Sequence, residues 1–141
     1  MSWGRYFNMV NKKNLFLKTL RDKKWDIPYY KPNRSQPEFD YWDPEDFGYI
    51  AIKTFYNKKE NKYYKFKVLA NTTTRRSEKK IKVFLIEKNN IELLIYQLAK
   101  YGKQPNKLAN KVHKFCWLIA NVPKYRKKVL SSAYKNELKN I

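Results

Sequence analysis

The chain has 141 residues and a formal net charge of +20, with 32 lysines and arginines against 12 acidic residues. Its length corresponds to about one domain, and its 43% hydrophobic and 17% aromatic content can supply a core, which excludes a typical disordered chain. The single cysteine, Cys116, excludes an internal disulfide framework, and no apolar run approaches the roughly 20 residues of a membrane-spanning helix.

The excess positive charge extends over most of the chain. Residues 1–37 carry nine basic and two acidic groups, residues 38–46 carry five acidic groups and no basic group, and residues 47–141 carry 23 basic and five acidic groups. Such self-repulsion does not stabilise a lone globular protein, but a polyanionic partner would neutralise it. Basic charge along most of the chain favours burial in RNA over a single compact DNA-reading patch.

The first 21 residues predict a basic amphipathic helix. They contain no acidic residue, and Phe7, Val10, Leu17 and Leu20 recur at helical spacing. The same composition is typical of a mitochondrial targeting segment, although serine is scarce. An N-terminal helix of the mature fold is the alternative, and both interpretations stay open.

Residues 25–46 combine four prolines with many aromatic residues, a pattern that excludes a long helix and favours an extended path. We predict an arm whose rings contact neighbouring proteins, with packing across the chain's own sheet as the alternative. The candidate contact residues are Trp25, Tyr29, Tyr30, Phe39, Tyr41 and Trp42.

Alternating apolar residues predict three antiparallel strands over residues 49–56, 63–70 and 81–86. A hairpin loop with asparagine at both ends, Asn57 and Asn61, joins the first two strands, since asparagine tolerates left-handed backbone. We place lysines and aromatic rings together on the outward face, where they could contact phosphates and bases, with an ordinary solvated face as the alternative. These residues are Lys53, Lys65, Lys67, Tyr49, Phe55 and Tyr63.

Three helices are predicted after the sheet. Asn89 and Glu92 have the spacing of a capping box, and the apolar stripe that follows would end at Gly102. Pro105 would begin a second helix, and the break at residues 121–123 would begin a third with a strongly basic outer face.

The predicted fold is therefore α+β. A small antiparallel three-stranded meander is covered by about three C-terminal helices in a compact domain over residues 47–141. A basic helix and an extended arm precede it over residues 1–46.

No catalytic, metal or cofactor site is predicted. His113 and Cys116 are one helical turn apart, but a structural zinc site needs four ligands and the chain has no other histidine or cysteine, so a buried core cysteine is favoured. The acidic residues at 38–46 could hold Mg²⁺ in a nuclease, yet no accompanying motif completes such a site. With three glycines in the chain, a phosphate-binding loop has little room.

The leading hypothesis is a non-catalytic rRNA-binding component of a ribosome, in contact with rRNA and neighbouring ribosomal proteins and with no small-molecule substrate. The expected setting is the mitochondrial matrix, with the cytoplasm as the alternative. The other hypotheses are an accessory subunit of a mitochondrial respiratory membrane complex, a small DNA-binding protein and, last, a metal-dependent nuclease that uses the acidic residues at 38–46. The candidate RNA-binding residues are Lys53, Lys58, Lys59, Lys65, Lys67, Arg75, Arg76, Lys79, Lys80, Lys124, Arg126, Lys127 and Lys128.

Overall fold

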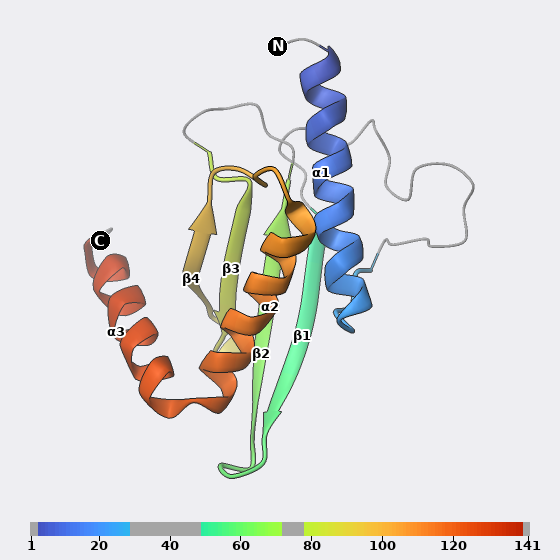
Figure 1. The fold of residues 1–141 in the computed structure, drawn as a ribbon. Helices are drawn as coiled ribbons and strands as arrows, with labels where there is room; N and C mark the ends of the chain where they lie inside the picture. The colour runs from blue at the N-terminus through green and yellow to red at the C-terminus, as the bar shows by residue number, and fades with distance from the viewer. Residues whose placement is uncertain (1–2, 29–48, 72–77, 140–141) are drawn as a thin grey trace.

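A computed structural model describes residues 3–28, 49–71 and 78–139, which form an α+β fold (Figure 1). One antiparallel sheet has the strand order β1-β2-β3-β4, so each strand lies beside its neighbour in sequence. The predicted α+β class is confirmed, but the predicted count of three strands is wrong. The elements are α1 (Trp3–Asp22), β1 (Tyr49–Asn57), β2 (Lys62–Ala70), β3 (Ile81–Ile86), η1 (Lys88–Asn90), β4 (Glu92–Leu98), α2 (Pro105–Asn121) and α3 (Pro123–Lys139).

The fourth strand occupies the segment in which we predicted a helix. Asn89 and Asn90 have φ angles of 63° and 58°, the two left-handed positions of a tight hairpin turn. The Ile91 amide donates to the Lys88 carbonyl across this turn at 3.5 Å. The Asn89 segment is therefore a hairpin turn and not a helix cap, and within the described chain two helices, not three, follow the sheet.

The hairpin between β1 and β2 forms as predicted. Phe55 pairs with Tyr64, and Tyr56 with Tyr63, close to the turn. Asn61 has a φ of 50°, so it supplies the left-handed backbone for which asparagine is suited.

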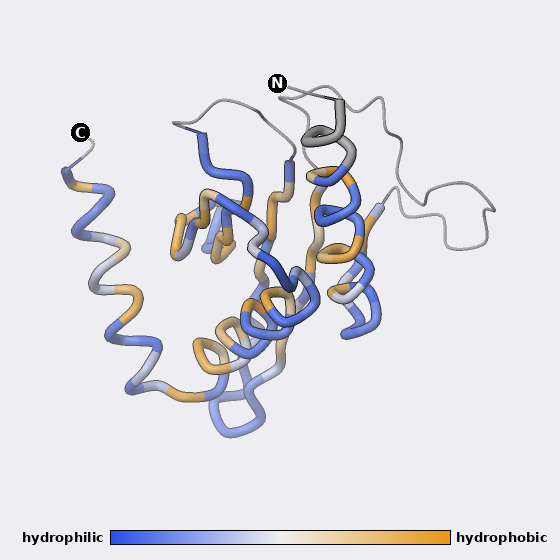
Figure 2. The backbone as a smooth tube through the Cα atoms, turned by 45° about the horizontal axis from the view of Figure 1, so that its top comes forward, coloured by the Kyte–Doolittle hydropathy of each residue, from blue (hydrophilic) through white to orange (hydrophobic). Residues whose placement is uncertain are grey.

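The core lies between the sheet and the two helices α1 and α2, which pack together over one face (Figure 1). The buried stripe of α2 has helical spacing, with Ala109, Val112, Cys116 and Ile119 facing inward. Figure 2 shows this apolar stripe turned toward the sheet, while α3 is mostly hydrophilic. From α1, three residues join the same core: Phe16, Leu17 and Leu20.

The helices cover the face of β1 that we had placed outward. Ala51 and Phe55 are buried, and Lys53 lies between them on the same face. Tyr49 also lies on this face, with its ring 4.4 Å from the Lys13 ammonium. The grouping of Lys53 with Lys65 was wrong because both alternating series of β1 are comparably apolar, so alternation alone does not choose the inner face.

None of the helices in residues 3–28 and 105–139 is long and apolar enough to cross a membrane. This finding agrees with the expectation of no transmembrane segment.

Candidate nucleic-acid interface

The strongest concentration of unbalanced charge lies in the C-terminal third of the chain. From Ala99 to Lys139 there are eleven basic residues and one acidic residue, Glu137, a net charge of +10. All ten lysines in this range are exposed, while Arg126 is half-buried. Two consecutive helices therefore present lysines to solvent with one carboxylate in their own segment, while Glu60 and Glu87 from elsewhere in the chain contact Arg126 and Tyr134 of α3.

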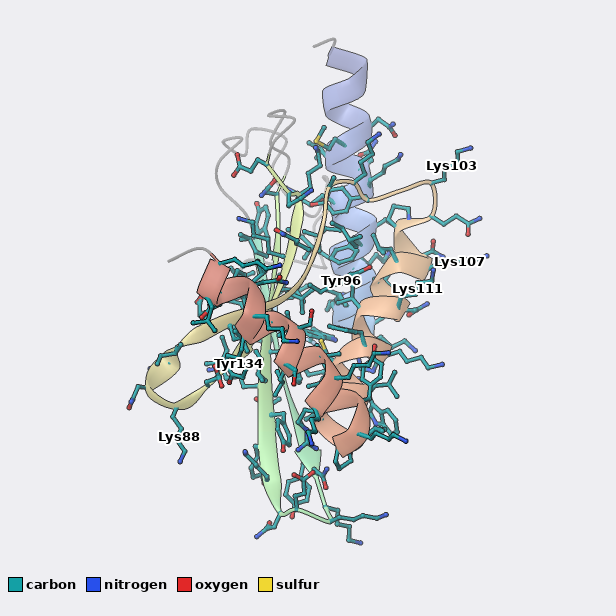
Figure 3. All side chains as sticks on the ribbon, turned by 90° about the vertical axis from the view of Figure 1, so that its left-hand side faces the viewer. Lys88, Tyr96, Lys103, Lys107, Lys111 and Tyr134 are labelled. Carbon is teal, nitrogen blue, oxygen red and sulfur yellow. The ribbon has the colours of Figure 1, made fainter. Side chains whose placement is uncertain are left out.

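The lysines of α2 lie opposite its buried stripe. Lys107, Lys111 and Lys114 are spaced four and three residues apart, which places them on one side of the helix. Lys103 precedes the helix, and Figure 3 shows Lys103, Lys107 and Lys111 projecting from the same side. We did not single out these lysines in the sequence, although their helical spacing and the lack of nearby acids were visible there.

On α3, Lys124, Lys127 and Lys128 are exposed in its first two turns. Arg126 is different, because Glu60 on the β1–β2 hairpin holds its guanidinium in two hydrogen bonds of 2.6 and 2.8 Å. The Arg126 Nε also donates to the Ile119 carbonyl at 2.7 Å. Arg126 therefore fixes α3 to the hairpin and is a poor candidate for phosphate contact.

Asn57 and Tyr64 complete this junction. The Asn57 amide donates to Glu60 at 2.6 Å and to the Ala120 carbonyl at the end of α2 at 2.8 Å. The Tyr64 hydroxyl donates to Glu60 at 2.9 Å, and the Arg126 guanidinium lies 4.4 Å from the Tyr64 ring. The hairpin, the end of α2 and the start of α3 are thus held as one unit.

The face of the sheet opposite α1 and α2, called the distal face, carries a second group of lysines and rings. Lys65 is exposed there, as predicted, and Tyr63 is 68% exposed with its ring 4.8 Å from that of Tyr56. Lys67 also lies there, but its ammonium contacts the Glu92 carboxylate at 2.5 Å. The distal face therefore offers stacking surface with less unbalanced charge than the helices.

The other predicted lysines lie in the connections. Lys58 and Lys59 are exposed in the β1–β2 turn, and Lys79 and Lys80 are half-buried just before β3. Arg75 and Arg76 lie outside the described residues, as do the acidic residues at 38–46.

Trp25 is 2% exposed and belongs to the chain's own core. Its indole N–H donates to His113 Nδ1 at 3.0 Å. Because Nδ1 accepts this hydrogen bond, the neutral imidazole of His113 carries its proton on Nε2. Burial lowers the pKa of His113, and Lys53 and Lys23 lower this pKa further. The pair joins the segment that follows α1 to α2. The other predicted arm residues lie outside the described ranges: Tyr29, Tyr30, Phe39, Tyr41 and Trp42.

Cys116 is buried in the core, as expected, and burial raises the pKa of its thiol, which disfavours the reactive thiolate. In the part of the chain that the structure describes, no three His, Cys, Asp or Glu side chains are grouped to hold a metal ion. Comparison with protein-family models, curated proteins and solved structures found no match to this chain.

Proposed function

We propose that the protein is a non-catalytic RNA-binding component of a ribosome, with the mitochondrial ribosome as the proposed setting and the cytoplasm as the alternative. The observation that carries this proposal is the +10 charge of residues 99–139, with all ten lysines exposed on or beside α2 and α3. Lysines neutralise RNA phosphates and release counterions, and this binding does not depend on base sequence.

The positions of the carboxylates support the same proposal. Glu60 binds the half-buried Arg126 of α3 and Glu92 binds Lys67 of the sheet, so these two acids are directed toward cations other than the exposed lysines of α2 and α3. A surface that served only to keep the protein soluble would be expected to mix both signs of charge. In this proposal, α2 and α3 contact rRNA, and neighbouring ribosomal proteins take up part of the remaining surface.

A binding titration with a labelled duplex RNA at several salt concentrations tests the proposal. The variant Lys103→Gln/Lys107→Gln/Lys111→Gln removes three neighbouring cations from α2. If each contacts a phosphate, the slope of log K against log salt falls by about 2–3, and affinity at ~100 mM salt falls tenfold or more.

The matched control is Lys18→Gln/Lys23→Gln/Lys88→Gln, which removes the same charge from α1, its C-terminal end and the β3–β4 turn. We expect this variant to keep most of the affinity and slope. Equal losses in both variants would show that only total charge matters and would contradict an interface on α2.

Sedimentation of a native lysate separates the proposal from the other hypotheses. The protein should run with ribosomal particles and move to light fractions after ribonuclease treatment. Persistence in a membrane-derived particle after digestion would favour a respiratory-complex subunit instead.

A further inference from the structure

A groove of about 870 Å³ runs between β4 and α3, at the edge of the sheet. This volume is within the range that bound small ligands occupy, about 300–1,000 Å³. Its walls are chemically mixed: aliphatic side chains from β4 and α3 alternate with the polar side chains of Gln97, Ser132 and Asn136. Figure 3 looks onto this side of the molecule and shows Tyr96 in view between α2 and α3.

Three aromatic rings from three different elements meet in this groove. The Tyr96 ring of β4 lies 5.2 Å from Phe115 of α2, with the ring planes 39° apart, and Phe115 lies 6.1 Å from Tyr125 of α3 in an edge-on arrangement. Tyr96 is 39% exposed, so Phe115 supports it from one side while part of its surface stays open to solvent. A supported and partly exposed ring is a suitable platform for a nucleobase.

Lysines of both helices lie close to these rings. Lys128 and Lys139 of α3 line the groove itself. Lys111 and Lys114 of α2 line a smaller hollow of about 320 Å³ that shares the three rings with it. The acidic residue of the groove, Glu137, is outnumbered by these lysines.

We propose that this groove binds an unpaired RNA segment, with a base stacked on Tyr96 and the flanking phosphates on lysines of α2 and α3. The proposal rests on the proposed RNA-binding function and assigns single-stranded RNA to this part of the surface. A duplex cannot use the groove in this way because its bases are stacked on each other and their faces are covered. The combination of polar side chains with lysines favours RNA over an apolar peptide, which would leave these polar groups without partners.

The test compares a ten-nucleotide single-stranded RNA with a duplex RNA of the same length, by fluorescence anisotropy at one salt concentration. Tyr96→Leu removes the ring and should weaken single-strand binding by about 5- to 100-fold, while duplex affinity changes less than twofold. Tyr96→Phe keeps the ring and should bind like the natural protein. Tyr63→Leu removes a more exposed ring from the distal face and is the matched control.

Each result of this comparison has a definite meaning. If the natural protein binds neither RNA, the proposed function fails together with the groove. If it binds both but Tyr96→Leu binds both unchanged, the groove proposal fails and the RNA-binding function stands. If Tyr63→Leu loses affinity for the single-stranded RNA but not for the duplex, the single-strand site lies on the distal face instead. If Tyr96→Leu weakens the binding of both RNAs equally, the groove does not select single-stranded RNA and the proposal is contradicted.

A peptide ligand would give a separate result. In that case Tyr96→Leu would leave both RNA affinities unchanged and would lose co-sedimentation with the ribosomal particle. That result would overturn the RNA assignment.

Discussion

Arg126 shows how the fold can give a residue a structural contact that the sequence does not reveal. It stands among Lys124, Lys127 and Lys128, and composition gives no reason to separate it from them. The guanidinium, unlike an ammonium group, presents a planar fork that matches a carboxylate, and Glu60 occupies that fork. The partner is 66 residues away in the sequence, so only the fold reveals the pairing.

The same junction predicts a pH dependence for stability. The hydrogen bond from Arg126 lowers the pKa of Glu60 from 4.5 to about 2, and the bond from the Tyr64 hydroxyl acts in the same direction. The folded state thus holds the carboxylate more strongly than the unfolded state does. This contribution is present above about pH 4.5 and is lost as the pH falls toward about 2.

We therefore predict that Glu60→Gln lowers the urea midpoint of unfolding at pH 7, and that its difference from the natural protein shrinks as the pH falls from about 4.5 to about 2. Urea titrations across this pH range measure the effect. Glu137→Gln changes the net charge equally on the exposed surface of α3 and should show a smaller difference. If the two variants follow the same pH curve, the junction contributes no specific stability.

At the scale of elements, the strands with long alternating runs and the helices bounded by proline were predictable. Pro105 and Pro123 open α2 and α3, as their fixed φ suggests. The strand after Asn90 was not predictable, because its apolar residues fit a helical stripe and a strand comparably well. These residues are Ile91, Leu94, Ile95 and Leu98. Tertiary pairing with β3 decides the outcome, and the two adjacent asparagines were the local indication of a hairpin.

That turn provides a prediction at the scale of the hairpin. Asn89→Val should destabilise the protein by about 1–2 kcal/mol, because a β-branched residue does not tolerate the positive φ of this position. Asn89→Gly should be close to neutral, since glycine adopts this backbone freely. Urea unfolding measures both changes.

Asn110→Val is the control for the loss of the asparagine side chain. Asn110 is exposed within α2, where valine and asparagine have similar helix propensities, so a change of a few tenths of a kcal/mol is expected. A comparable loss in Asn89→Val and Asn110→Val would show that backbone conformation does not explain the effect.

At the scale of the whole molecule, composition predicts the class of partner but not the surface that binds it. The sequence placed candidate contacts on the sheet, whereas Lys53 lies on the helix-covered face and Lys67 is paired with Glu92. The sequence pattern places Tyr96 on a helix, whereas its contacts with Phe115 and Tyr125 depend on its position in strand β4. Sites assembled from separate elements follow from topology, which a single sequence does not contain.

The net charge of +20 has a consequence that does not depend on where RNA binds. Like charges at this density repel one another more in the folded chain than in the expanded unfolded chain, so repulsion destabilises the free protein. Raising salt from ~10 mM to ~1 M shortens the Debye length from about 30 Å to about 3 Å and screens that repulsion.

We predict that the melting temperature of the RNA-free protein rises by several degrees over this salt range, since about 1 kcal/mol corresponds to about 2–4 °C at this chain length. Salt also strengthens apolar burial, so Lys103→Gln/Lys107→Gln/Lys111→Gln is the control: its core is unchanged, but its net charge falls from +20 to +17. That variant should melt higher than the natural protein at low salt and rise less with added salt. Scanning calorimetry at each salt concentration measures both curves. If the melting temperatures of the two proteins rise in parallel with salt, the lysines of α2 do not repel their neighbours appreciably. The excess of positive charge would then no longer indicate that the protein needs a polyanionic partner.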